Sequence, residues 1–371
     1  MRVLYLTRGY TAHDHRFLAK LSQTGNEIGY ARLEAATGAD DPHPLPSSAT
    51  CLRLHASARK LTWSDYPRLR RELSGVIGEF SPDVVHAGPV QQGGLIAAWA
   101  GFKPLVTMSW GSDILREAER GPGRLAARYA LARTSVFVCD CQAVREASIA
   151  LGAPASRIVV FPWGVDLRRF SPGDGSGLRR RLGWEDAFVL LSTRAWEPLY
   201  GLDTLVEGFV RAARQDVSLR LLMLGRGSLE AWIRTRLAEA GMEGRVHFAG
   251  RVDLEELPDH YRAADAYLSA SRCDGSSVSL LEALACGLPA LVSDIPGNRE
   301  WVTPRENGWW FRTGDADALA EAIRDARATQ ADRRELGRRS RAIAEARADW
   351  DRNFPRLLDA YQMAIEQRGS K

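Results

Sequence analysis

Two carboxylates stand on either side of a helix start in the segment DGSSVSLLEALACG, residues 274–287. Asp274 precedes the apolar helical run, and Glu282 lies eight residues later inside it. Three small residues follow the first acid: Gly275, Ser276 and Ser277. A helix that starts with small residues offers free backbone N–H groups to an anion such as a diphosphate. Carboxylates on both sides can accept hydrogen bonds from hydroxyl groups. A ligand with a central diphosphate and hydroxyls at both ends is a nucleotide sugar.

A purely structural interpretation of these residues competes with the binding one. Asp274 and the serines would then cap the helix while Glu282 faces water, and Gly287 would end the helix as a C-cap. Glu282, however, lies between Leu281 and Ala283, close to the apolar stripe, where an unpaired acid is unfavourable. The residues alone leave both interpretations open.

Short apolar runs alternate with helical stretches along the whole chain, which favours parallel strands covered by helices on both faces. The first half contains RVLYLT, EIGYARL, DVVHA, PLVTMSW, SVFVCD and RIVVFPW, and the second contains FVLLST, LRLLMLG, VHFAG, AYLSAS and PALVSD. Proline, glycine, serine and aspartate cluster in SPGDGSGL, residues 171–178, which indicates a linker. In an open parallel sheet, the ligand crevice lies beyond the carboxyl ends of the strands, so the turn after AYLSAS should face it.

The domain organisation follows from this pattern and from the length of 371 residues, which suits two α/β domains. We expect an α/β fold of two Rossmann-like, doubly wound domains that face each other across a cleft. The first covers residues 1–170, and the second covers residues 171–349. A C-terminal helix over residues 350–371 should return to the first domain.

Composition describes a globular protein, with 45% hydrophobic and 26% charged residues. No apolar run approaches the roughly 18 residues that a membrane span needs, and the first residues lack the pattern of a signal peptide. Five cysteines without zinc spacing predict reduced thiols and a cytoplasmic location.

Charge is unevenly divided between the two halves. Residues 1–170 hold 21 Lys and Arg against 15 Asp and Glu, and residues 171–371 hold 29 against 31. Such a modest surplus favours a solvated surface over nucleic-acid binding. It leaves open contact with an anionic acceptor or, peripherally, with the inner face of the membrane.

Several longer segments resemble the retaining glycosyltransferases of family 4, which have the GT-B fold. DGSSVSLLEALACGLPALVSDIPGNRE is similar to the family's E-x7-E segment. Four more segments match in order: SPDVVHAGPVQQGGLIAAWAGFKPLVTMSWGSDI, RIVVFPWGVDLRRFSP, GRVDLEELPDHYRAADAYL and NGWWFRTGDADALAEAI. The resemblance therefore extends over nearly the whole chain. It implies transfer of a hexosyl group from a UDP- or GDP-sugar to a hydroxyl of a small-molecule, glycan or lipid-linked acceptor.

The resemblance also implies roles for individual residues of the second domain. Asp274 would bind sugar hydroxyls, Glu282 the ribose, and Arg194 the diphosphate. Further donor-binding positions are Gly225, Arg251, Gly275, Ser276, Ser277, Val278 and Tyr200.

Three positions depart from the family pattern. Asp274 is one methylene shorter than the usual glutamate, so that the sugar sits differently or is a different sugar. Tyr200 stands where many members have a phosphate-binding lysine, and the second phosphate cation is therefore unidentified. Trp110 stands where many have histidine, and because indole accepts no proton we expect it to shape or stack rather than act as an acid or base.

Residues of the first domain are assigned to the acceptor side. They are Gly9, His13, Asp14, His15, Arg16, Trp110 and Asp113. For the segment TAHDHRFLAKL, a helix cap by Asp14 with solvated histidines is the favoured account of the residues taken individually.

The mechanism attributed to this family is same-face attack, in which the leaving phosphate takes the acceptor proton. Asp274 and Glu282 then bind and orient, and Arg194 stabilises charge on the leaving phosphate. The chain is expected to need no cofactor and no metal. DAD and DWD match a metal-binding DxD motif in letters, but Asp315 and Asp349 open helical segments, where aspartate caps.

Three other functions compete. GRGSLEA after LRLLML is similar to the fingerprint of an NAD(P)-dependent Rossmann oxidoreductase, but the next strand, RVHFAG, lacks the expected ribose-binding acid. A pyridoxal-phosphate phosphorylase needs a Schiff-base lysine, and the second domain has none before Lys371. A non-catalytic protein that binds nucleotide sugars stays open, given Trp110 and Tyr200.

Overall fold

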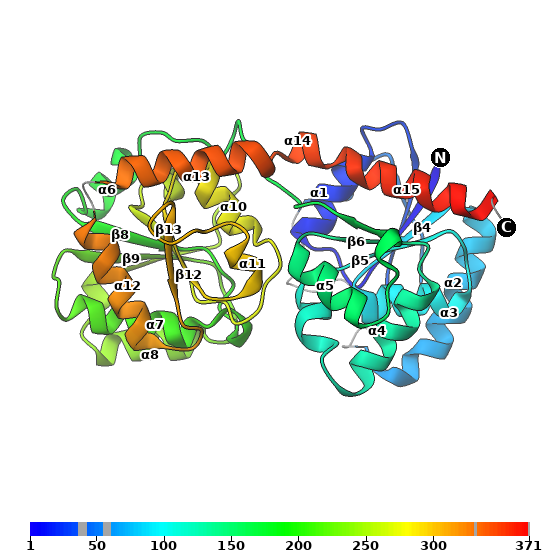
Figure 1. Cartoon of the computed structure of the whole chain (residues 1–371), viewed down its shortest axis with the longest axis horizontal. Coiled ribbons are helices and arrows are strands. Elements are labelled where there is room, and N and C mark those ends of the chain that lie inside the picture. Colours follow the sequence, from blue (N-terminus) through cyan, green and yellow to red (C-terminus); the bar gives the residue numbers. More distant parts are fainter. Residues whose placement is uncertain (36–42, 55–60, 330–331, 370–371) are drawn as a thin grey trace. The chain divides into compact units, whose positions relative to one another are not determined.

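The computed structural model describes residues 1–35, 43–54, 61–329 and 332–369. The chain forms two compact units, shown in Figure 1. The first unit comprises Met1–Phe161 and Pro355–Lys371, and the second comprises Pro162–Phe354. Each unit is built around one sheet whose paired strands are all parallel, as the alternating pattern predicts.

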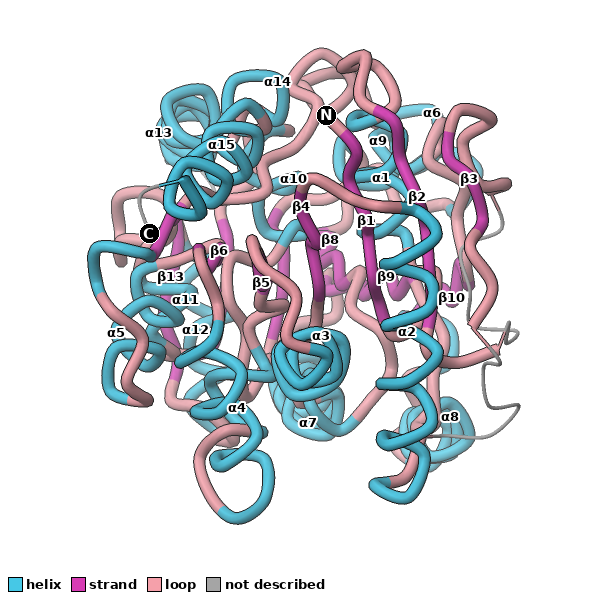
Figure 2. The backbone as a smooth tube through the Cα atoms, turned by 90° about the vertical axis from the view of Figure 1, so that its right-hand side faces the viewer, coloured by secondary structure: helices cyan, strands magenta, loops and turns pink. Residues whose placement is uncertain are grey.

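The sheet of the first unit has the strand order β3-β2-β1-β4-β5-β6-β7. Figure 2 shows β2, β1 and β4 lying side by side. Its strands are β1 (Arg2–Thr7), β2 (Glu27–Arg32), β3 (Ala49–Cys51), β4 (Val84–Ala87), β5 (Leu105–Met108), β6 (Val136–Cys139) and β7 (Ile158–Val160). Its helices are α1 (Ala12–Leu21), α2 (Tyr66–Phe80), α3 (Leu95–Ala100), α4 (Gly121–Arg133), α5 (Gln142–Ala150) and α15 (Pro355–Gly369).

The sheet of the second unit has the order β10-β9-β8-β11-β12-β13. Its strands are β8 (Phe188–Ser192), β9 (Leu219–Leu224), β10 (Val246–Gly250), β11 (Ala266–Ser269), β12 (Ala290–Ser293) and β13 (Gly308–Phe311). Its helices are α6 (Ser176–Leu182), α7 (Leu202–Ala213), α8 (Glu230–Glu239), α9 (Leu257–Arg262), α10 (Val278–Ala285), α11 (Pro296–Arg299), α12 (Ala316–Ala328), α13 (Arg333–Arg347) and α14 (Trp350–Asn353).

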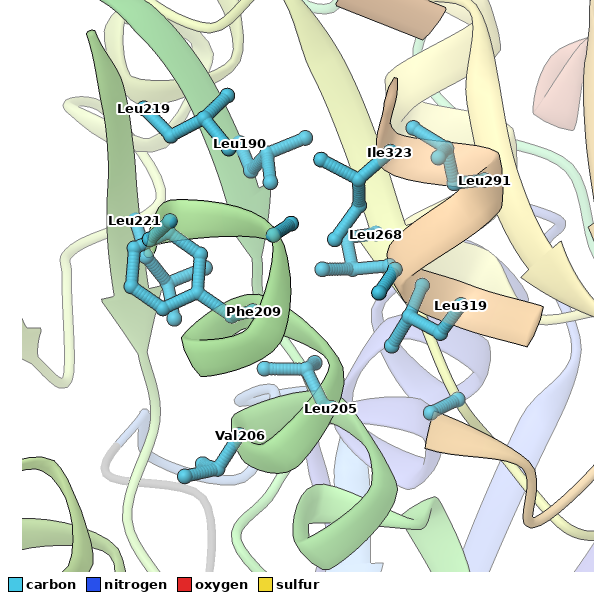
Figure 3. Close-up of a cluster of buried hydrophobic side chains, with 14 of the residues drawn as sticks. Leu190, Leu205, Val206, Phe209, Leu219, Leu221, Leu268, Leu291, Leu319 and Ile323 are labelled. Atoms are coloured by element: carbon cyan, nitrogen blue, oxygen red, sulfur yellow. The ribbon is translucent and has the colours of Figure 1, made fainter. Parts of the chain in front are cut away.

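The core of the second unit shows why its sequence folds this way. In α7 the apolar residues recur at three- and four-residue spacing, and Leu205, Val206 and Phe209 are almost fully buried. They pack with Leu319 and Ile323 of α12 against one face of the sheet (Figure 3). The sheet face is supplied by Leu190, Leu219, Leu221, Leu268 and Leu291.

Helix α15 belongs to the first unit although it comes last in the chain. It packs on β4, β5 and β6. The hydroxyl of Tyr361 lies 2.5 Å from Nδ1 of His86, which is buried on β4. Burial lowers the pKa of His86 to about 3, so its imidazole is neutral. This hydrogen bond ties the last helix to the middle of the first sheet.

Along the chain, the boundary between the two units lies between Phe161 and Pro162, earlier than the predicted residue 170. Residues 162–170 make their contacts in the second unit, whereas the sequence pattern assigns them to the first domain. The physical reason is local, because Val165 forms a parallel bridge with Asp349 and the ring of Phe170 meets that of Tyr261.

Candidate functional site

The strand order of the second sheet defines where a ligand site can form. From β8 the chain continues to β9 and β10 on one side, and from β11 to β12 and β13 on the other. A crevice opens at such a switch point, beyond the carboxyl ends of the two strands. Arg194 follows β8 and Asp274 follows β11, so the fold brings both predicted residues to this point.

Arg194 is held on several sides. Its Nη2 lies 2.7 Å from Oδ2 of Asp274, and its Nη1 donates to the hydroxyls of Ser277 at 2.6 Å and Ser279 at 3.1 Å. The guanidinium lies over the ring of Tyr200, 4.1 Å from its centroid. Arg194 is thus a fixed, largely buried cation, in the geometry that guanidinium groups use for anions and aromatic faces.

Burial and charge act in opposite directions on this ion pair. Burial, the largest single effect, would lower the pKa of Arg194, but the charge of Asp274 together with Tyr267, Tyr200 and Tyr261 outweighs it, and the pKa is raised. Burial raises the pKa of the Asp274 carboxyl, and Arg194 opposes that rise. The side chains are 12% and 17% exposed, so the pair is screened less than a surface pair.

Helix α10 does not use these residues as conventional side-chain caps. Its N-cap is Ser277, whose side chain makes no capping hydrogen bond. The hydroxyl of Ser276 instead accepts a hydrogen bond from Nε1 of Trp301 at 3.1 Å. At the other end Gly287, with φ +75°, closes the helix as predicted, because Leu288 N–H donates to the carbonyl of Ala283. The capping interpretation is therefore wrong for Asp274, which pairs with Arg194.

Glu282 does not simply face water. It is half-buried, and Tyr261 donates a hydrogen bond from its hydroxyl to Oε2 at 2.7 Å. The same hydroxyl lies 3.2 Å from Oγ1 of Thr193, next to Arg194 in the chain. Burial and the charge of Glu282 raise the pKa of Tyr261 well above its usual value, which keeps it a donor. Tyr261 thus orients the carboxylate and connects it to the loop after β8.

Three residues near Arg194 were not predicted: Tyr261, Tyr267 and Ser279. Tyr267 has its hydroxyl 2.8 Å from the hydroxyl of Ser279, which in turn accepts from Arg194. The signal that could have found Tyr261 and Tyr267 is their presence in GRVDLEELPDHYRAADAYL, where Tyr261 lies just before the strand that leads to Asp274 and Tyr267 lies within it.

The remaining donor-side residues lie at neighbouring strand ends. Gly225 follows β9 with φ +108°, and a Cβ there would stand 2.9 Å from the carbonyl oxygen of Arg194. Any side chain at this position would push the arginine loop away. Arg251 follows β10 and is exposed.

The two DxD segments are helix caps, as predicted. Asp315 accepts hydrogen bonds from the N–H groups of Asp317 and Ala318, and Asp349 from those of Asp351 and Arg352. Within the described part of the chain, no helix is long and apolar enough to cross a membrane.

On the acceptor side, the side chains of the segment after β1 make more contacts with the rest of the first unit than the sequence suggests. The N-cap of α1 is Thr11, and Asp14 completes the capping box by accepting from its backbone N–H at 2.8 Å. Asp14 is buried and also accepts from the hydroxyl of Tyr5, and burial raises its pKa. The predicted cap by Asp14 is thus corrected to a shared one, because the aspartate lies inside the first turn.

The histidines of this segment are half-buried rather than solvated. His13 stacks on Trp110, with ring centroids 5.4 Å apart, and the hydroxyl of Tyr10 lies 2.7 Å from Nδ1 of His15. Trp110 therefore takes part in stacking. Arg16 is half-buried, and the carbonyl of Gly9 accepts a hydrogen bond from Tyr30.

Asp113 fastens two loops together. Its carboxylate accepts from the hydroxyl of Ser109 at 2.6 Å and from the N–H groups of Val90 and Trp110, both at 3.0 Å. Burial raises its pKa. Its observed partners all belong to the loops after β4 and β5, so it supports the surface on which Trp110 stands.

Comparison with known families gives two matches along the chain. Residues 4–169 match the profile described as Glycosyltransferase Family 4, and residues 177–343 match the one described as Glycosyl transferases group 1. A D-inositol 3-phosphate glycosyltransferase of Geodermatophilus obscurus is 37% identical over 58% of this chain and 49% of that protein. The D-inositol 3-phosphate glycosyltransferase 1 of Catenulispora acidiphila is 30% identical over 79% of this chain and 77% of that protein.

The alignments with several curated relatives span about half of their length. Among solved structures, Anabaena HepE in complex with UDP has a TM-score of 0.77 at 20% identity, with both chains fully covered. Sucrose-phosphate synthase of Thermosynechococcus elongatus has a TM-score of 0.81 at 19% identity, over 99% of this chain and 100% of the other. These likenesses confirm the predicted α/β fold of GT-B type, and none of the comparisons supports an oxidoreductase. The chain belongs to the family 4 type glycosyltransferases.

Proposed function

We propose that this protein is a retaining, metal-independent hexosyltransferase that uses a UDP- or GDP-sugar as donor. The observation that carries the proposal is the fixed guanidinium of Arg194 at the N-terminus of α10, with the carboxylates of Asp274 and Glu282 on either side. This arrangement offers a cation and free helix N–H groups to a diphosphate and acceptors to hydroxyls at both ends.

Each group has a role in the proposed reaction. Glu282, oriented by Tyr261, binds the ribose diol, and Asp274 binds hydroxyls of the sugar. Arg251 meets the base, and Gly225 lets the nucleotide approach closely. Tyr200 supports Arg194 from below its plane instead of supplying a second cation.

The bond between the sugar C1 and the β-phosphate oxygen breaks while the acceptor oxygen bonds to C1 from the same face. The acceptor proton passes to the leaving phosphate, so no protein base is required. Arg194 stabilises the charge that grows on this phosphate.

For the acceptor we propose a polyol phosphate of the inositol phosphate type, either free or as a lipid headgroup. The names of several relatives support this class. His13, Trp110 and Arg16 at the carboxyl end of the first sheet would meet the acceptor, with Asp113 holding the loop. A cytoplasmic location, and contact with the membrane surface, remain predictions from the cysteines and the charge surplus.

A thermal-shift panel of UDP- and GDP-sugars tests the donor, because a ligand that binds the folded state raises the melting temperature, and more so the lower its dissociation constant at a given concentration. Transfer to inositol phosphate, with the anomeric configuration of the product read by NMR, tests the reaction. Failure of every nucleotide sugar to stabilise the protein rejects the proposal. Binding without transfer or hydrolysis would support a non-catalytic binding protein instead.

A further inference from the structure

Two positive features meet at the start of α10. The guanidinium of Arg194 touches Ser277, the N-cap, and Ser279 in the first turn. A helix N-terminus carries the equivalent of about half a positive charge. With the Arg194 side chain only 12% exposed, water screens this accumulated charge poorly. An anion beside Arg194 is therefore favourable whether or not a ligand is present.

Asp274 supplies that anion, and its carboxylate also takes hydrogen bonds from the backbone N–H of Gly275 and the hydroxyl of Ser277. Its pairing with Arg194, however, is one of charge rather than of an aligned hydrogen bond. Its Oδ2 lies 2.7 Å from Nη2 of Arg194. Both Oδ2 of Asp274 and Nε of Arg194 are buried, and neither makes an aligned hydrogen bond to any other group that the structure describes. A buried N–H without an acceptor is unfavourable. The cation thus keeps a donor that a phosphate oxygen could satisfy better than this carboxylate does.

We propose that Asp274 is the resident counter-ion of Arg194 and that a nucleoside diphosphate binds by displacing its carboxylate from the guanidinium. This inference rests on the proposed function. The diphosphate and the carboxylate compete for one cation, so Asp274 opposes binding of the diphosphate part. The displaced carboxylate then meets the sugar hydroxyls of a complete donor. Asp274 in this way favours nucleotide sugar over the nucleoside diphosphate that remains after transfer.

The direction in which one substitution changes the affinity for a nucleoside diphosphate separates this role of Asp274 from others. Asp274→Asn removes the competing charge and keeps the shape, so UDP or GDP should bind about three- to tenfold more tightly, as for loss of a close like charge. A residue that only binds sugar would leave diphosphate affinity unchanged. One that is needed to hold Arg194 in place would weaken it.

The experiment is isothermal titration of UDP and GDP, and of the nucleotide sugar found to bind, into wild type and Asp274→Asn. Asp317→Asn is the matched control, because it removes the same charge from an ion pair whose carboxylate is 84% exposed. It should change each dissociation constant by less than about twofold. Asp274→Ser, with the melting temperature of each variant, provides a second test if the asparagine variant folds poorly.

Tighter diphosphate binding, with a smaller preference for nucleotide sugar over diphosphate, supports the proposal. Equal or weaker diphosphate binding by both Asp274 variants overturns it and leaves the proposed function standing. If no nucleotide or nucleotide sugar binds wild type, the proposed function itself fails.

Discussion

Glu282 and Tyr261 allow the ribose role to be tested as a pair. Glu282→Ala removes a half-buried carboxylate that accepts from Tyr261. Hydrogen bonds to a charged group contribute roughly 1.5–3 kcal/mol, and each 1.4 kcal/mol is tenfold, so donor affinity should fall by one to two orders of magnitude. Tyr261→Phe leaves the charge and removes only the orienting hydroxyl. A hydrogen bond between neutral groups contributes about 0.5–1.5 kcal/mol, so the loss of this hydroxyl should weaken donor binding about two- to twelvefold.

The two effects should not add, because the shortest hydrogen bond of the Tyr261 hydroxyl is to Glu282, and we expect Tyr261 to act on the donor through that carboxylate. In the Glu282→Ala background, Tyr261→Phe should change donor affinity by less than about twofold. Dissociation constants for the nucleotide sugar give the four corners of the cycle, and the melting temperature checks each fold. Glu282→Ala also leaves the fully buried Tyr261 hydroxyl without its charged partner, so we expect it to melt lower than wild type. Unchanged donor affinity in Glu282→Ala, or fully additive losses, would refute this account.

Three further outcomes follow from the structure. Arg194→Ala should lower kcat about a hundredfold and donor affinity much less, because charge on the leaving phosphate grows toward the transition state. Steady-state kinetics measure both, with Arg181→Ala, which removes an exposed arginine, as the control. Equal losses in kcat and in donor affinity would indicate ground-state binding instead. Activity should survive excess EDTA but fall steeply with rising salt concentration. The reason is that Tyr200 replaces the family's usual lysine, so few fixed cations contact the phosphates and salt screens them readily. Complete loss of activity with EDTA, restored by Mg²⁺, would contradict this. Burial lowers the pKa of His86 to about 3 from its usual 6.5, so the unfolded chain binds the proton more tightly than the folded one. The free energy of unfolding therefore falls as the pH drops below 6.5. His86→Gln should make the decline of Tm between about pH 7 and 4 less steep, and an unchanged profile would show that other groups dominate.

The fold was predictable because its signals are local. Continuous apolar runs separated by helical periodicity indicate parallel strands, and the strand ends then place Arg194 and Asp274 at one edge. What these side chains touch was not predictable in the same way. The partners of Arg194 are Asp274, Ser277 and Ser279, some 80 residues later in the chain, and their pairing depends on the conformations of two loops.

Capping shows the same limit on a smaller scale. An aspartate before a helix and one inside its first turn differ by a few residues, and single-sequence patterns place helix ends loosely. Asp14 was therefore assigned as the cap when Thr11 fills that place. Tyr261 could not be predicted from the sequence, because a tyrosine in a short helix more often fills a core, and only the fold places its hydroxyl 2.7 Å from Glu282.

The hydrogen bond between His86 and Tyr361 has a consequence for synthesis on the ribosome. The first unit is discontinuous, and its sheet receives α15 only after residues 162–354 have been translated. Domains of nascent chains commonly fold as units in order of emergence. Here the second unit emerges whole, whereas β4, β5 and β6 gain their packing against α15 only after the last residues have been translated. The part of the protein that is translated first is therefore the part that is completed last.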